Sequence, residues 1–61
     1  MTTPQYYFVR TLRSSYPHTK INHFVNLGRF IVTISDDDGV IQSWEVEKDG
    51  RVKELYRRDE K

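Results

Sequence analysis

Two Asp-Gly pairs, Asp38-Gly39 and Asp49-Gly50, constrain the fold of this chain more than any other feature. An Asp-Gly pair between segments rich in β-branched and aromatic residues is a strong local signal for a β-hairpin. In residues 28–36, before the first pair, apolar side chains recur with a period of two, which predicts a strand with one buried face. The apolar residues on that face are Phe30, Val32 and Ile34. The second half of the chain is therefore predicted to be a three-stranded antiparallel meander.

The charges around the second turn indicate its register. With residues 48–50 as a three-residue loop, Glu45 lies opposite Lys53, whereas a two-residue loop places Glu45 opposite Glu54. Opposite charges across a ladder stabilise it by about 0.2–1 kcal/mol, and like charges destabilise it. The three-residue loop is therefore predicted, and it also places Val46 opposite Val52.

The first turn, with residues 37–39 as the same kind of loop, places Val32 opposite Trp44. In the register of the second turn, Leu55 falls on the face opposite to the predicted core, so this residue marks either a bulge or a helical end. The two registers together define one apolar face of the meander. Its residues are Phe30, Val32, Ile34, Val40, Trp44, Val46, Val52 and Tyr56.

The first half of the chain is predicted to add one strand and one short helix. Residues 5–13 have high β-propensity and are predicted to be a strand. Residues 19–27 are predicted to be a helix, because Thr19 is a good N-cap and Gly28 suits the position after the last turn. Its apolar stripe consists of Ile21, Phe24 and Val25. The predicted fold class is α+β, with the order β-α-β-β-β, in one small domain of residues 1–61 whose ends, 1–4 and 59–61, fray. Which edge of the sheet the first strand joins is left open.

The size and composition of the chain exclude several classes of protein. A chain of 61 residues without cysteine has no disulfide and no cysteine-based zinc site. It contains no apolar run of about 20 residues, which a membrane-spanning helix needs. Residues 1–13 lack the pattern of a secretory signal, so we expect a cytoplasmic protein without membrane contact. A deep catalytic pocket is not expected in so small a domain.

The charges are distributed very unevenly along the chain. Residues 1–35 contain no aspartate or glutamate, whereas residues 36–61 hold all nine acidic residues. Six of the eight aromatic residues also lie in the acid-free part. Basic residues among aromatic ones suit nucleic acid, because cations contact phosphates and aromatic rings stack on unpaired bases. The two halves also neutralise each other in part, since the predicted register pairs Arg29 with Glu47.

No group of residues predicts catalysis, a metal site or a cofactor. Residues 36–39 resemble a calcium loop only in composition, because Ile34 would occupy its first ligand position. His18 and His23 have no third ligand at a suitable spacing. Ser14 and Ser15 lack any sign of an orienting group or an oxyanion hole. We therefore expect a protein that is not an enzyme and binds no metal or cofactor.

The sequence predicts a small non-enzymatic binding protein that contacts nucleic acid, or another polyanion, through its basic and aromatic N-terminal half. The predicted contacts are Arg10, Arg13, Lys20 and Arg29 for phosphates, and Tyr7 and Tyr16 for stacking. The alternative is a protein–protein interaction module, such as an accessory or inhibitor protein of the kind that phages and mobile elements encode. Such a module would use an open sheet edge or the acidic turn at residues 36–38. DNA, RNA and protein partners, and a monomer or a homodimer, are left open.

Overall fold

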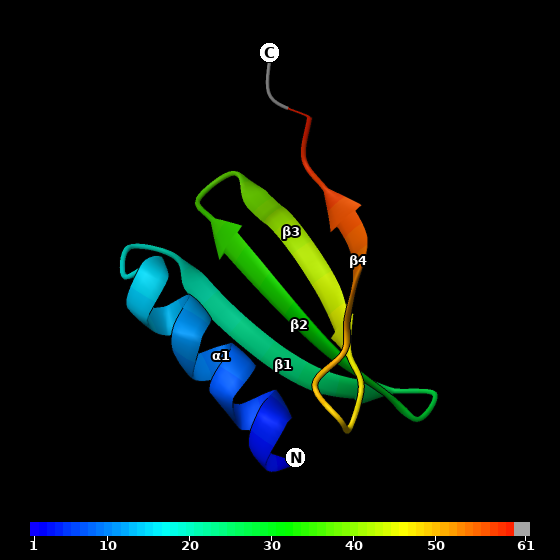
Figure 1. Ribbon diagram of the computed structural model, residues 1–61. Coiled ribbons are helices and arrows are strands. Elements are labelled where there is room, and N and C mark those ends of the chain that lie inside the picture. The colour runs from blue at the N-terminus through cyan, green and yellow to red at the C-terminus, as the bar shows by residue number, and fades with distance from the viewer. Residues whose placement is uncertain (60–61) are drawn as a thin grey trace.

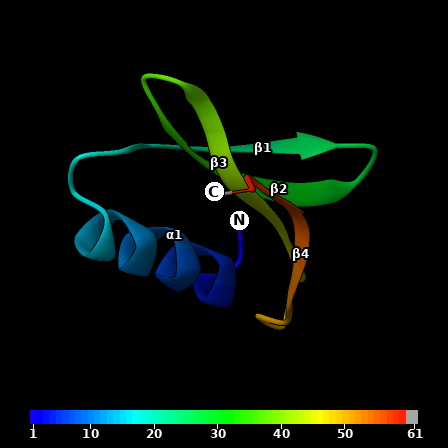
Figure 2. The same ribbon diagram turned by 90° about the horizontal axis from the view of Figure 1, so that it is seen from above.

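One helix packs on a single face of a four-stranded antiparallel sheet (Figures 1 and 2). The computed structural model describes residues 1–59. The elements are α1 (Thr3–Ser15), β1 (Lys20–Asn26), β2 (Arg29–Asp36), β3 (Gly39–Val46) and β4 (Val52–Arg57). The strands lie in the order β1-β2-β3-β4. The predicted small α+β protein with an antiparallel meander is confirmed, but a helix takes the place of the first strand. No helix within residues 1–59 is long and apolar enough to cross a membrane.

The prediction of a strand at residues 5–13 is wrong, because this segment belongs to α1. A capping box starts the helix. The Thr2 hydroxyl accepts a hydrogen bond from the Gln5 backbone N–H at 3.4 Å, and the Gln5 side-chain oxygen accepts one from the Thr2 backbone N–H at 2.9 Å. Val9 and Leu12 follow Gln5 at helical spacing and are buried with it. Capping and burial of this stripe outweigh the β-propensity of the tyrosine, phenylalanine and valine residues.

The prediction of a helix at residues 19–27 is also wrong, because this segment forms β1. Strand β1 pairs with β2 along its whole length, with Ile21 opposite Ile34. Leu27 and Gly28 both have positive φ, 53° and 77°, and close the β1–β2 hairpin as a two-residue turn. A glycine in the left-handed region ends helices and closes hairpins alike. The same residue therefore supported both interpretations.

The predicted meander register is confirmed at its centre. Val32 lies opposite Trp44, and Glu45 lies opposite Lys53. The first turn differs, because Asp36 pairs with Gly39 across a two-residue turn and not across the predicted three-residue loop. A β-bulge next to this turn restores the predicted register in the rest of the ladder.

A second bulge changes the C-terminal part of β4. The register shifts between Ser43 and Trp44, so that Ser43 pairs with Tyr56 and Trp44 pairs with Glu54. Leu55 is therefore the extra residue of a bulge, which was one of its two predicted roles. Because paired residues share a face, Tyr56 lies on the face away from α1, opposite to the predicted one.

The core lies between α1 and the β1–β3 part of the sheet. Its buried residues are Val9, Leu12, Phe30, Val32 and Val46, with Phe8, Ile21 and Trp44 packed at its margin. Four residues predicted to be in the core, Val40, Val52, Tyr56 and Phe24, are exposed. The two bulges turn Val40 and Tyr56 away, and Phe24 lies on the uncovered face of β1. Val52 is exposed because α1 lies nearest β1 and leaves the edge strand β4 open (Figure 2).

The start of α1 is tied to the end of β3 and the loop that follows it. The Thr2 hydroxyl donates to the Lys48 carbonyl at 2.8 Å, and the Gln5 amide donates to the Val46 carbonyl at 2.9 Å. These contacts join residues far apart in the sequence. They orient α1 across the sheet and so determine which of its sides faces outward.

Replacing Gly50 with alanine is expected to destabilise the protein more than replacing Gly39. Both glycines have positive φ, so alanine is strained at either position. A Cβ atom at Gly50 would lie only 3.0 Å from Pro4 Cβ, whereas a Cβ at Gly39 has no neighbour within 4 Å. Overpacking of this kind costs about 1–3 kcal/mol. Urea unfolding of Gly50→Ala and Gly39→Ala measures the difference. Equal losses in the free energy of unfolding would show that the contact between Pro4 and residue 50 adds no strain.

Candidate nucleic-acid interface

The outward side of α1 brings together tyrosine and arginine residues at helical spacing. Tyr6, Tyr7, Arg10 and Arg13 are all exposed and lie outside the buried stripe of the helix. The rings of Tyr6 and Tyr7 are neighbours, with centroids 5.8 Å apart and planes inclined by 60°. We call these four residues the helix surface. Since its side chains come from one rigid element, their relative positions are well defined.

The two arginines of the helix surface have no carboxylate beside them. Among residues 1–59, the ion pairs involve only Arg29, Arg51, Arg57 and Arg58 as cations. Arg10 and Arg13 are in none of them, and no acidic residue occurs before residue 36. The helix surface therefore keeps its positive charge instead of being neutralised by the acidic half of the chain.

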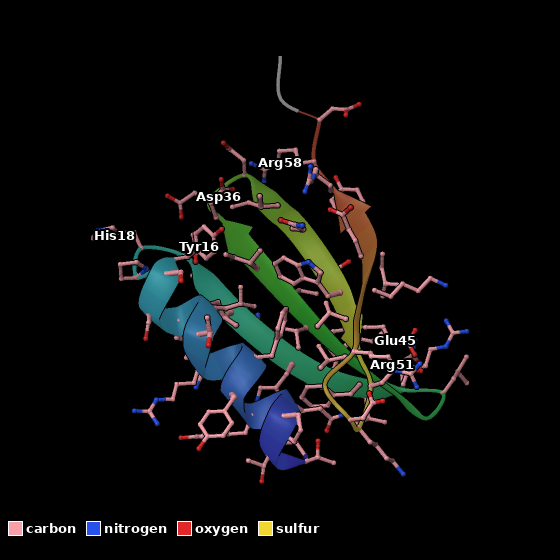
Figure 3. The ribbon with its side chains drawn as sticks, viewed as in Figure 1. Tyr16, His18, Asp36, Glu45, Arg51 and Arg58 are labelled. Carbon is pink, nitrogen blue, oxygen red and sulfur yellow. The ribbon has the colours of Figure 1, made fainter. Side chains whose placement is uncertain are left out.

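Tyr16 and Lys20 lie beyond the C-terminal end of α1. The Tyr16 backbone N–H caps the helix by donating to the Leu12 carbonyl at 2.9 Å, and its side chain is exposed (Figure 3). Lys20 starts β1 opposite Ser35. Because the next residue, Ile21, packs on the core, Lys20 lies on the sheet face away from α1. Tyr16 follows Leu12 by four residues, so it lies at the end of α1 on the side of the buried stripe, and neither Tyr16 nor Lys20 belongs to the helix surface.

Arg29 is separated from the other predicted contact residues. It starts β2, and its Nε lies 3.9 Å from Glu45 Oε1. Figure 3 shows Glu45 at the opposite end of the sheet from Tyr16. The predicted site therefore divides into the helix side, with Tyr7, Arg10, Arg13 and Tyr16, and the open sheet face, with Lys20 and Arg29.

Sequence reasoning missed Tyr6 as a member of the site. In a strand at residues 5–13, alternate side chains point to opposite faces, so Arg10 would be separated from Tyr7 and Arg13. A helix places all three on one side, with Tyr6 beside them. The capping box at Thr2 and Gln5 was the signal that could have found this arrangement.

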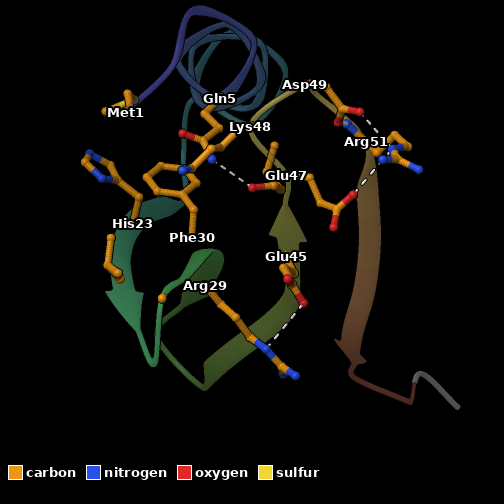
Figure 4. Close-up of a pocket in the computed structure, with 13 residues that line it drawn as sticks. Met1, Gln5, His23, Arg29, Phe30, Glu45, Glu47, Lys48, Asp49 and Arg51 are labelled. Atoms are coloured by element: carbon orange, nitrogen blue, oxygen red, sulfur yellow. Dashed lines mark hydrogen bonds and ion pairs between the residues drawn. The ribbon is translucent and has the colours of Figure 1, made fainter.

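A cleft of about 760 Å³ opens between the start of α1, the β1–β2 turn and the β3–β4 loop (Figure 4). Its lining holds three cations, Arg29, Lys48 and Arg51, and three carboxylates, and both arginines are paired. Arg29 lies beside Glu45, while Arg51 Nε lies 3.4 Å from Glu47 Oε2 and 2.9 Å from Asp49 Oδ2. The cleft is therefore nearly balanced in charge and offers an anion less attraction than the helix surface does.

Hydrogen bonds from Arg51 hold the pKa of Asp49 below its ordinary value. The main cause is the Arg51 backbone N–H, which donates to Asp49 Oδ1 at 3.1 Å, followed by the guanidinium. In the same cleft, the exposed His23 ring stacks on Phe30 with centroids 5.6 Å apart. Within residues 1–59, no three His, Cys, Asp or Glu side chains gather as a metal site would require.

The acidic turn at residues 36–38 is partly occupied by Arg58. The Arg58 guanidinium donates to both carboxylate oxygens of Asp36 at 2.9 Å and to the Gly39 carbonyl at 2.9 Å. These side-chain hydrogen bonds lower the pKa of Asp36 from its ordinary value. Asp36 therefore holds β4 against the β2–β3 turn, and only Asp37 and Asp38 remain exposed for a partner.

No family model, curated protein or solved structure matches this chain.

Proposed function

We propose that this protein is a small non-enzymatic binding protein of the cytoplasm that contacts nucleic acid through the helix surface. The observation that carries the proposal is the position of Arg10 and Arg13. Both are exposed on α1 among tyrosines, and neither has an ion-pair partner within residues 1–59. An unpaired arginine on a rigid helix is available to a phosphate without first breaking an internal contact.

The residue types of the helix surface suit both parts of a nucleic acid. Each arginine that neutralises a phosphate releases condensed counterions, which favours binding at low salt. Tyr6 and Tyr7 lie beside the arginines, and Tyr16 lies at the end of the same helix. Exposed aromatic rings contribute about 1–3 kcal/mol for each unpaired base that stacks on them. Contacts to phosphates thus supply most of the affinity, and the tyrosines add to it where bases are unpaired.

Removing the two arginines together is expected to reduce both the affinity and its dependence on salt. Each phosphate contact with duplex DNA contributes about 0.9 to the slope of log affinity against log salt. Two contacts therefore weaken wild-type binding by about tenfold between about 50 and 200 mM salt. In Arg10→Ala/Arg13→Ala this part of the slope should disappear. Fluorescence anisotropy of a labelled oligonucleotide at several salt concentrations measures the slope.

The matched control is Arg51→Ala/Arg57→Ala, which removes the same charge from two arginines that are already ion-paired. The control should retain the wild-type affinity within about twofold, because surface ion pairs already satisfy these groups. Equal losses in the two double variants would mean that binding follows net charge alone, and the helix surface would not be the site.

A protein–protein module is the second candidate, because β4 offers an open edge. Strand β4 is the last strand of the sheet, and all six of its residues are exposed. An extended peptide could add to its free edge through backbone hydrogen bonds. A stoichiometric protein captured from a lysate, together with no salt-sensitive binding to oligonucleotides, would favour this candidate over the first.

A further inference from the structure

The face of the sheet away from α1 is not covered by any segment within residues 1–59 (Figures 1 and 2). The strand register places two complete rows of side chains across this face. The first row is Asn22, Thr33, Ser43 and Tyr56, and the second is Phe24, Ile31, Glu45 and Lys53. Their chain neighbours Val32 and Trp44 pack on the helix side, which determines the direction of both rows. We call this the open sheet face.

Two aromatic side chains stand on the outer strands of the open sheet face. Phe24 on β1 is 47% exposed and Tyr56 on β4 is 49% exposed. Three strand spacings, or about 14 Å, separate their two strands, and the two residues stand in neighbouring rows. Thr33 and Ser43 occupy the centre of the first row, and Ile31, which is only 8% exposed, and Glu45 occupy the centre of the second. The face is thus a shallow platform with an exposed ring on each side, and it lacks the continuous apolar area of a stable protein interface.

The charge of the open sheet face is positive. Within the four strands it carries Lys20, Arg29 and Lys53 against one carboxylate, Glu45, which already lies 3.9 Å from Arg29. Lys20 and Lys53 take part in no ion pair in the described part of the chain. Lys20 starts β1, and Lys53 is the second residue of β4, so the two lysines lie close to opposite ends of the platform. This arrangement is complementary to a strand of phosphates that crosses the sheet.

We infer that the open sheet face is a second binding surface, specific for single-stranded nucleic acid. Unpaired bases stack on Phe24 and Tyr56, and Lys20 and Lys53 contact the phosphates between and beside them. Duplex DNA cannot use this face in the same way, because its bases are stacked inside the helix. The amide of Asn22, on the strand that carries Phe24, is placed to hydrogen-bond base edges. The inference shares its ligand class with the proposed function but uses the opposite side of the molecule.

The test compares a short oligo(dT) with a DNA hairpin that has the same number of phosphates, using anisotropy at about 50 mM salt. Wild-type protein should bind the single strand more tightly. The variant Phe24→Ala/Tyr56→Ala should lose at least about tenfold in affinity for the single strand, because two stacking contacts are removed. Its affinity for the hairpin should stay within about twofold.

Two further variants keep this test independent of folding effects. Val25→Ala/Val52→Ala changes exposed residues on the same outer strands but on the helix side, and it should bind like wild type. Lys20→Gln/Lys53→Gln removes charge from the platform without altering the core. It should weaken binding of the single strand and reduce its salt dependence, even if the aromatic double variant fails to fold.

The outcomes also separate this inference from the proposed function. Equal binding of both probes by the wild type, or an unchanged single-strand affinity in a folded Phe24→Ala/Tyr56→Ala variant, overturns the inference. The role of Arg10 and Arg13 in the proposed function is then unaffected. Conversely, loss of the single-strand preference only in the aromatic variant supports the inference, even where Arg10→Ala/Arg13→Ala binds normally. A protein that binds the wild type, but not the aromatic variant, while both bind oligonucleotides equally, would assign this face to a protein partner.

Discussion

Replacing Phe30 with alanine is expected to leave most of the chain unfolded at room temperature. Phe30 is only 8% exposed and packs in the core with Val32 and Val46, beneath α1. Truncating a buried phenylalanine to alanine costs about 3–5 kcal/mol. The whole core of a domain this small supplies only about 3–5 kcal/mol of net stability. The substitution should therefore remove nearly all of the free energy of unfolding.

Phe24→Ala is the matched control for this prediction. Phe24, on the adjacent strand β1, pairs with Ile31 of β2 but is 47% exposed on the open sheet face. Its truncation removes much less buried area, and about 1 kcal/mol or less should be lost. Circular dichroism and urea unfolding followed by Trp44 fluorescence measure both variants. Equal destabilisation would contradict the placement of β1 with Phe24 facing away from α1.

Replacing Gln5 with alanine is expected to destabilise the protein by about 2–4 kcal/mol. The Gln5 side chain is 5% exposed, and its amide donates to the Val46 carbonyl at 2.9 Å while its oxygen accepts from the Thr2 N–H. Alanine leaves that carbonyl, beneath α1, without its donor and removes half of the capping box. An unsatisfied buried polar group costs about 1–3 kcal/mol, and a lost cap adds to it.

Gln42→Ala provides the comparison for Gln5→Ala. The Gln42 amide also donates one hydrogen bond, to Glu54 Oε1 at 2.8 Å, but this bond is exposed to solvent. Water replaces the lost partner at such a site, so the free energy of unfolding should change by no more than about 0.5 kcal/mol. If the two glutamine variants lose the same stability, the contact between the start of α1 and the end of β3 contributes nothing beyond a surface hydrogen bond.

The meander could be predicted because its signals are local. The Asp-Gly turns and the pairing of Glu45 with Lys53 depend on residues within one hairpin. The bulge beside the first turn could not be predicted, since it arises where a two-residue turn and the pairing of Val32 with Trp44 require different registers. The bulge at Leu55 was one of two predicted alternatives, and only the pairing of β4 with β3 decided between them. The effect of a bulge is large for single residues, as Tyr56 shows. A shift of one position moved it from the predicted core to the open sheet face.

The candidate site was predicted in part. The acid-free stretch with Arg10 and Arg13 is visible in the sequence, and their availability depends on the absence of nearby carboxylates. These arginines lie on the same side as Tyr6 and Tyr7 only if the segment is a helix, whereas its high β-propensity predicts a strand. The division of the predicted residues between the helix side and the open sheet face required knowledge of which strand each residue occupies.

The sequence by itself determined the α+β class, the two Asp-Gly hairpins and the separation of acidic from basic residues, because these depend on residue type and short-range spacing. Only the tertiary structure decided that residues 5–13 are helical and that residues 19–27 are a strand. Both segments carry apolar side chains that fit either period, so their local preferences are weak. Burial of Val9 and Leu12 against the sheet, and the pairing of β1 with β2, decide between them. Each of these interactions joins residues that are distant in the chain.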